Sequence, residues 1–82
     1  MQVKIAPQID RLLAVSQARS ALRAGRLREI RERHGFSQRE LARALGVDES
    51  AVSRWEAGER VPREQVAERL SALLDALEKA DL

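Results

Sequence analysis

A glycine between two short helical segments, Gly46, restricts the fold of this chain more than any other feature. The first segment opens with Ser-Gln-Arg-Glu at residues 37–40. In this pattern the Ser37 hydroxyl accepts a hydrogen bond from the Glu40 N–H, and the Glu40 carboxylate accepts one from the Ser37 N–H. We therefore expect a helix from Ser37 to about Leu45, where a glycine ends it.

The second segment begins at Asp48, a residue type whose side chain caps helix N-termini. It is expected to run to about Ala57, where Gly58 stops it. Two short helices are thus joined by three or four residues around a glycine. This is the helix-turn-helix arrangement.

Helical patterns also flank this motif. Residues 8–24 are expected to form a helix, one side of which carries Ile9, Leu12, Leu13, Ser16 and Ser20, with Leu22 near it. A further helix is expected over about residues 22–34, with His34 as a solvent-facing last residue and Gly35 after its end. Pro62 is expected to open one long last helix, whose apolar stripe comprises Val66, Leu70, Leu73, Leu74 and Leu77.

Composition limits the classes of protein that remain. Eighty-two residues suit one domain, and 44% hydrophobic content with a single Phe and a single Trp calls for an aliphatic core. The absence of cysteine excludes disulfides and thiolate metal sites, and one histidine cannot form a histidine metal cluster. No metal and no cofactor is expected. Because charged residues interrupt every apolar run, no membrane span or signal peptide is expected, and the default is a cytoplasmic protein.

Positive charge is concentrated in the middle of the chain. Residues 19–63 carry eleven arginines and seven acidic residues, whereas residues 64–82 carry two basic and five acidic residues. Arginine suits phosphate and base-edge recognition because its planar guanidinium donates two parallel hydrogen bonds. Arginines paired with glutamates on a solvated helical surface would explain the same composition.

The motif resembles the helix-turn-helix of the Cro/C1-type (Xre) transcription regulators, over about residues 27–62. Several features coincide in register: Ser37-Gln38, Leu41-Ala42, Leu45-Gly46-Val47, Val52-Ser53, Trp55-Glu56 and Gly58-x-Arg60-x-Pro62. The resemblance implies an all-α, lambda-repressor-like helix-turn-helix bundle, here with an extra N-terminal helix and a long C-terminal helix. One domain over residues 1–82 is expected, with an N-terminal extension at 1–21, a core motif region at 22–62 and a C-terminal helix at 63–82.

The family resemblance also implies which residues contact DNA. It places base-reading residues at Glu49, Ser50 and Arg54, on a helix 49–57 that would enter the major groove. Arg54 would donate to guanine O6 and N7, whereas Ser50 can donate or accept and Glu49 could accept from a cytosine amino group. Phosphate contacts are expected from Gln38, Arg39, Arg43, Ser53, Trp55 and Arg60, with Arg63 as a further candidate.

Each of these residues also has a plainer interpretation. Glu49 could be an acid that favours the positive end of the helix dipole, and Asp48 is a cap rather than a base reader. Trp55 could pack mainly in the core, and each arginine could be a solvated charge. The acidic residues Glu29, Glu32, Glu40, Glu56 and Glu59 are expected on exposed helical faces, paired with arginines. With no catalytic triad, phosphate-binding glycine loop or metal-ligand cluster, the sequence does not predict an enzyme.

Both ends of the chain could bring in partners. Val66, Leu70, Leu73, Leu77 and Ala80 have the spacing of a short coiled-coil seam, although the same stripe could pack on the motif helices. A homodimer would favour a palindromic operator in double-stranded DNA. The leading hypothesis is a transcriptional repressor. The alternatives are an antitoxin-like or other protein-binding module that uses residues 1–20, and a motif that serves only as a scaffold.

Overall fold

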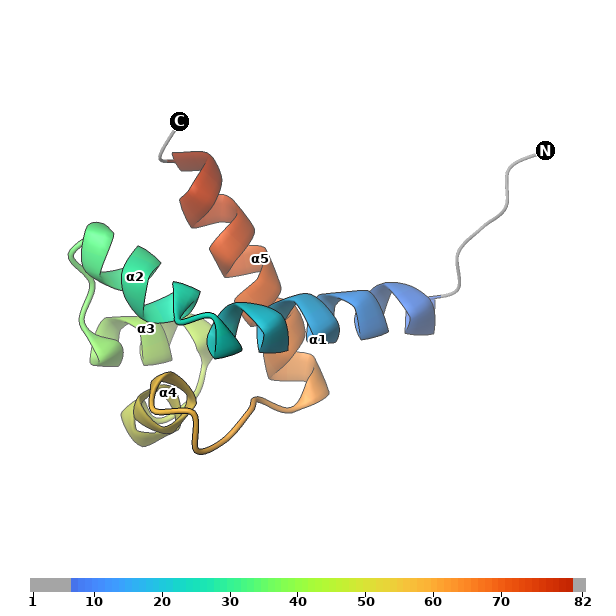
Figure 1. Ribbon diagram of the computed structural model, residues 1–82, viewed down its shortest axis with the longest axis horizontal. Helices are drawn as coiled ribbons and strands as arrows, with labels where there is room; N and C mark the ends of the chain where they lie inside the picture. The colour runs from blue at the N-terminus through green and yellow to red at the C-terminus, as the bar shows by residue number, and fades with distance from the viewer. Residues whose placement is uncertain (1–6, 81–82) are drawn as a thin grey trace.

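Five α-helices account for the regular structure of residues 7–80, the part of the chain that the computed structural model describes (Figure 1). They are α1 (Pro7–Arg23), α2 (Arg26–Arg33), α3 (Gln38–Leu45), α4 (Glu49–Glu56) and α5 (Glu64–Ala80). No strand occurs among the described residues, so the all-α class is confirmed. The two motif helices are α3 and α4, with the extra helix α1 before them and the long helix α5 after them.

Helix α2 begins four residues later than the sequence pattern indicated. We expected a helix from about Leu22, but Gly25 has a φ of 74° and separates α1 from α2, which begins at Arg26. A residue in this left-handed conformation cannot continue a right-handed helix, and glycine adopts it without steric cost. The last helix also begins later than expected, at Glu64. Pro62 is buried in the loop before it, and the first helical hydrogen bond runs from the Ala67 N–H to the Arg63 carbonyl oxygen.

The start of α3 has the expected capping box. The Glu40 N–H donates to the Ser37 hydroxyl over 3.0 Å, and the Ser37 N–H donates to the Glu40 carboxylate over 2.8 Å. Asp48 has the extended backbone of an N-cap residue at α4, but its side chain forms no capping hydrogen bond. The position of this cap was predicted correctly, whereas the side-chain bond was not.

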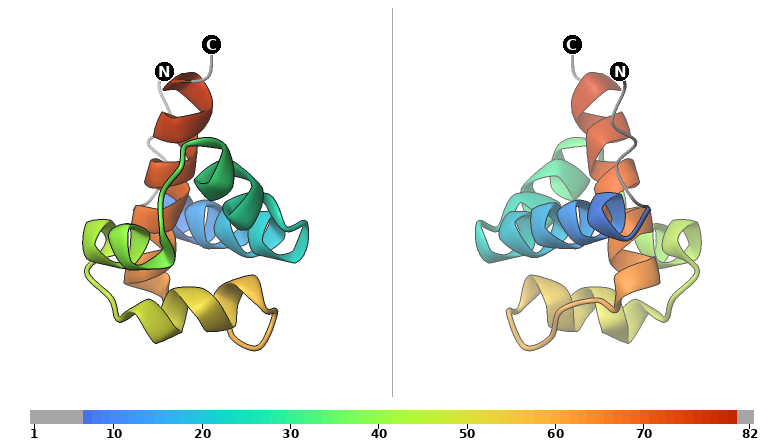
Figure 2. Two further views of the ribbon diagram at one scale, coloured as in Figure 1. Left: turned by 90° about the vertical axis from the view of Figure 1, so that its left-hand side faces the viewer. Right: turned by 90° about the vertical axis from the view of Figure 1, so that its right-hand side faces the viewer.

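Helix α5 forms the centre of an aliphatic core. It packs against α1, α2 and α3, and its Leu70 is fully buried together with Val52 of α4 (Figures 1 and 2). Leu74 is also buried, whereas Val66, Leu73 and Leu77 are partly buried and packed against the core. The prediction that the α5 stripe packs on the rest of the chain is therefore confirmed.

The face of α1 that packs against the core is not its most apolar face. Val15, Ala18 and Leu22 are buried in the common core, on a helix that packs mainly against α5. The larger side chains Ile9, Leu12 and Leu13 are 50%, 64% and 54% exposed. The apolar stripe seen in the sequence is thus real, but it faces solvent. Residues 1–6 of the predicted partner-binding segment 1–20 lie outside the described residues.

His34 is less exposed than predicted. It ends α2, and its Nε2 lies 3.2 Å from the backbone oxygen of Leu77 on α5. Its ring also stacks on Phe36, with centroids 5.9 Å apart and planes 7° from parallel. His34 therefore helps to dock the end of α2 on α5, rather than pointing freely into solvent. Among residues 7–80, no helix is both long enough and apolar enough to cross a lipid bilayer.

Candidate nucleic-acid interface

The turn between α3 and α4 sets the orientation of α4 relative to α3. Gly46 ends α3 with a φ of 73°, and its N–H bonds back to the last turn of the helix. Arg69 of α5 donates from Nη1 to the Leu45 carbonyl oxygen over 3.1 Å. The same nitrogen would lie 3.3 Å from a Cβ atom placed at Gly46. The turn is therefore held by the last helix as well as by its own glycine.

Helix α4 has one buried and one exposed side, and it lies at the lower edge of the molecule in Figures 1 and 2. Val52 and Trp55 are 0% and 5% exposed and fix the inward side. The exposed side carries Glu49, Ser50, Ser53 and Arg54. The three expected base readers thus share an outer surface with Ser53. Trp55 packs in the core, which leaves its expected phosphate contact untested.

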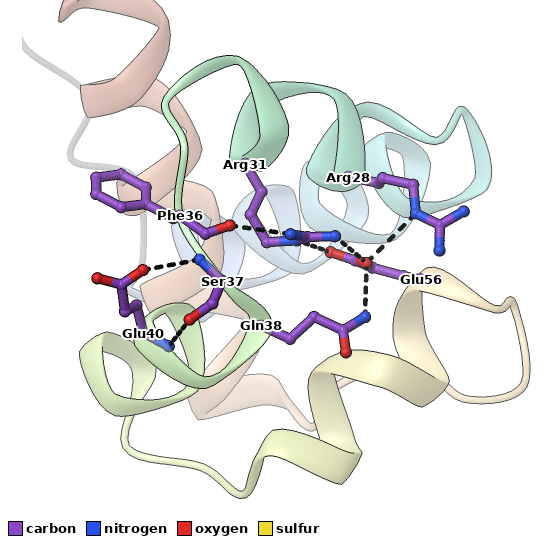
Figure 3. Close-up of polar contacts among 7 residues, drawn as sticks. All are labelled: Arg28, Arg31, Phe36, Ser37, Gln38, Glu40 and Glu56. Carbon is purple, nitrogen blue, oxygen red and sulfur yellow. Dashed lines mark hydrogen bonds and ion pairs between the residues drawn. The ribbon is translucent and has the colours of Figure 1, made fainter.

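Glu56 at the end of α4 is the centre of a buried polar network (Figure 3). Its side chain is only 1% exposed, so the prediction of an exposed surface acid was wrong. Arg31 of α2 donates to both carboxylate oxygens, from Nε over 2.7 Å and from Nη2 over 2.9 Å. Gln38 of α3 donates to the same carboxylate over 2.9 Å, and Arg28 lies 3.6 Å away. This network links three helices.

Arg31 forms a further hydrogen bond, which extends the network to the loop before α3. Its Nη1 donates to the Phe36 carbonyl oxygen over 2.9 Å, directly before the cap residue Ser37 (Figure 3). One guanidinium therefore ties the loop that precedes α3 to the last residue of α4. The side chain is 11% exposed, which limits competition from water.

The ionisation of the pair follows from these contacts. Burial raises the pKa of Glu56, but hydrogen bonds from Arg31 and Gln38 and the nearby arginine charges outweigh it, so the pKa falls below its ordinary value. The hydrogen bond to Glu56 raises the pKa of Arg31 above its ordinary value. Both groups are therefore charged at neutral pH.

Two of the expected contact residues have partners within the protein. Gln38 uses its amide nitrogen on Glu56, although an amide NH₂ carries a second hydrogen that can donate elsewhere. Arg39 lies with its Nε 3.4 Å from the Glu49 carboxylate, and both side chains are largely exposed. This pair connects α3 with the first turn of α4. It joins an expected phosphate contact to an expected base reader.

Three of the other expected contacts are arginines without a counter-charge among the described residues. Arg43 on α3, Arg54 on α4 and Arg60 in the following loop are exposed, and no residue within 7–80 forms an ion pair with them. By contrast, Arg11 of α1 and Arg26 of α2 pair with acids of α5. Exposed arginine side chains without an ion-pair partner among residues 7–80 are thus available around α4.

The sequence analysis did not predict the structural roles of three residues that shape this surface. Arg31, Glu56 and Arg69 act through contacts 24 or 25 residues apart in the chain. No local sequence pattern predicts such contacts, since Arg54 is equally adjacent to the buried Trp55 and is exposed. The surface as a whole can donate hydrogen bonds from arginine, serine and amide groups.

Comparison with known proteins agrees with this architecture. A family model described as Helix-turn-helix (HTH_3) matches residues 27–82. Three relatives carry the printed name "Putative HTH-type transcriptional regulatory protein". The protein of Pyrococcus furiosus is 48% identical over 50 residues, that of Pyrococcus abyssi 42% identical over 50, and that of Thermococcus kodakarensis 43% identical over 49.

These alignments cover 60–61% of this chain but only 15–16% of each relative. No solved structure matches the chain. The family model spans more than half of the chain, and it includes both motif helices and all of α5 that the structure describes. The matched segment begins at Leu27, so α1 lies outside it. The chain belongs to the Cro/C1-type helix-turn-helix family of transcriptional regulators.

Proposed function

We propose that this chain is a sequence-specific DNA-binding repressor that inserts α4 into the major groove of double-stranded DNA. The observation that carries the proposal is the two-sided character of α4. Val52 and Trp55 anchor one side in the core, while Ser50 and Arg54 stand on the exposed side. An α-helix fits the major groove, where each base pair presents a distinct pattern of donors and acceptors.

Arg54 and Ser50 are the proposed base-reading residues. Arg54 is exposed and has no ion-pair partner among residues 7–80, so it can donate two hydrogen bonds to a guanine. Ser50 lies one turn earlier on the same side of α4. Glu49 would have to exchange its contact with Arg39 for a cytosine amino group, so its role in base reading depends on separating that pair.

The phosphate contacts are proposed at both ends of the motif. Arg43, Ser53 and Arg60 are exposed, and Gln38 retains a free amide hydrogen. The N-terminal turn of α3 adds backbone N–H groups that favour an anion. Such contacts fix the position of the protein on DNA without reading sequence. Repression follows if the occupied site overlaps a promoter, because a bound protein then blocks polymerase.

Selection of bound duplexes from a random DNA pool tests this proposal, followed by affinity measurements at two salt concentrations. We expect an enriched sequence and an affinity that falls steeply with salt, since phosphate contacts release counterions. A matched control is the Ser50→Ala, Arg54→Ala double variant, which keeps the phosphate contacts and should lose most of the enrichment. If the wild-type protein enriches no sequence, the proposal is wrong.

A second candidate function is a protein-binding module, and one observation favours it. Ile9, Leu12 and Leu13 are at least half exposed and lie close together on one helix, and adjoining exposed apolar side chains can mark a protein-binding site. An antitoxin-like role would use this surface for a different protein. A pull-down with the immobilised protein tests this role. The Leu12→Glu variant should no longer retain the partner protein, while its DNA binding stays intact.

A further inference from the structure

We propose that the outer face of α1, formed by Ile9, Leu12, Leu13, Ser16 and Ser20, pairs antiparallel with the same face of a second copy of this chain. The proposed dimer is symmetric about a two-fold axis that passes close to residues 13–16. It differs from the coiled-coil seam considered on α5, because Leu70 of that stripe is fully buried within one chain and cannot serve a second.

The outer face lies opposite the side of α1 that is already used. With 3.6 residues per turn, Ile9, Leu13, Ser16 and Ser20 fall within one narrow sector. Val15, Ala18 and Leu22 lie on the other side and are buried against α5. None of the five outer-face residues is charged, and all five are exposed. The face is therefore uncharged, with its apolar part at Ile9, Leu12 and Leu13, and it is accessible without any rearrangement.

The arrangement of large and small side chains makes this face complementary to itself. Its large residues all lie in the N-terminal half and its two serines in the C-terminal half. In an antiparallel pair, the register that places Leu13 opposite Ser16 of the second copy also places Ile9 opposite Ser20. Leu13 and Ile9 then each meet a serine, while Leu12 falls opposite Gln17. The two pairs of a large and a small side chain let the helices approach and interdigitate. A parallel pair would place large residues against large ones.

Symmetry about this axis also orients the two reading helices, an argument that rests on the proposed function. In Figure 1, α4 lies below α1, and Figure 2 shows that α5 lies behind α1 as seen in Figure 1. The outer face lies on the side of α1 opposite α5, and the proposed two-fold axis crosses α1 along the vertical of Figure 1. Rotation about it leaves the second α4 on the same lower side. Both reading helices can thus face one DNA duplex, as a palindromic site requires.

Measurement of molar mass by sedimentation equilibrium over a range of concentrations tests the surface. The wild-type protein is expected to approach twice its chain mass of 9.2 kDa. Leu13→Glu should weaken association by more than about tenfold, because it buries two carboxylates near the axis without partners. Val61→Glu is the matched control, since Val61 is 51% exposed and lies in the loop before α5. It should associate like the wild type.

Disulfide cross-linking tests the register, which is convenient because the chain has no native cysteine. A mixture of Ile9→Cys and Ser20→Cys proteins should form the mixed disulfide, whereas Ile9→Cys alone should not. In the proposed register two copies of residue 9 lie about 16 Å apart along the helix axis, too far for a disulfide. Efficient cross-linking of Ile9→Cys with itself would overturn the antiparallel pair.

Three results would overturn the proposal: a monomer at every concentration, a dimer that survives Leu13→Glu, or stable binding of this face only to a different protein. Its failure is distinguishable from failure of the proposed function. If the protein is a monomer that still enriches one half-site, the proposed DNA binding stands and the proposed dimer is wrong. If the protein is a dimer that Leu13→Glu weakens but it enriches no DNA sequence, the proposed dimer surface stands and the proposed DNA binding is wrong.

Discussion

The carboxylate of Glu56, the last residue of α4, accepts two hydrogen bonds from the guanidinium of Arg31, over 2.7 and 2.9 Å. Arg31 lies on α2, so the pair joins the reading helix to a helix outside the motif. Gln38 of α3 completes the network. Because one carboxylate collects donors from two other helices, the angle of α4 depends on it. This pair is therefore the main polar support of the proposed DNA-reading surface.

Removal of the charge at Glu56 should destabilise the protein. Glu56→Gln leaves the Arg31 guanidinium 11% exposed and without its counter-charge, and we expect the free energy of unfolding to fall by about 3 kcal/mol. Urea unfolding monitored by circular dichroism measures the change. Glu59→Gln is the control, because Glu59 is exposed and its replacement should cost less than about 0.5 kcal/mol. Equal stability of the two variants would contradict the structural role of Glu56.

Stability should also depend on pH through this carboxylate. The pKa of Glu56 is lower in the folded chain than its ordinary value of 4.5, so the unfolded chain binds the proton first. The contribution is therefore complete above about pH 4.5 and is lost as the pH falls through the folded pKa. Urea unfolding at a series of pH values should show a smaller loss on acidification for Glu56→Gln than for the wild type. Parallel pH profiles would show that Glu56 is not the responsible group.

Loss of the Arg54 side chain should change specificity. Arg54→Ala is expected to weaken binding to the selected site by about 1–3 kcal/mol and to relax the preference at one base position. Fluorescence anisotropy with single-base variants of the site measures both effects. Lys79→Ala is the control, because Lys79 lies in the last turn of α5, far from α4 (Figure 1). An equal loss on every sequence would remove Arg54 as a base reader.

Loss of Arg60 should instead affect all sequences alike. Arg60 is exposed in the loop after α4 and forms no ion pair with residues 7–80, so a phosphate is its proposed partner. Arg60→Ala should lower the slope of log affinity against log salt by about 1 and leave base preference unchanged. Titrations of the selected duplex and of a scrambled duplex at several salt concentrations distinguish a phosphate contact from a base contact. An unchanged salt slope would place Arg60 outside the DNA contact.

Local sequence signals predicted the motif well because its boundaries are set by local chemistry. The capping box at Ser37 and the glycine stops at Gly46 and Gly58 need only neighbouring residues. Gly25 was harder, because a glycine within a helical pattern can either continue or interrupt a helix. The positive φ of Gly25 shows that it interrupts the helix in this chain.

Features that depend on tertiary contacts were not predictable in the same way. The apolar pattern of α1 marks Ile9 and Leu12 more strongly than Ala18, yet Ala18 is buried because a small residue allows the close crossing of α1 and α5. The burial of Glu56 likewise depends on Arg31, which lies 25 residues earlier. The roles of Arg54, Ser50 and the phosphate-contact residues stay predictions, since they concern a partner outside the chain.

The most direct test of the central claim is an NMR titration of the isotope-labelled protein with a DNA duplex. The account predicts that the largest amide shifts fall on α4 from Glu49 to Arg54, with further shifts at the start of α3 and near Arg60. Helix α1 should show none beyond those that accompany self-association. If the shifts cluster on α1, or if DNA causes no shifts at low salt, α4 is not the surface that binds DNA.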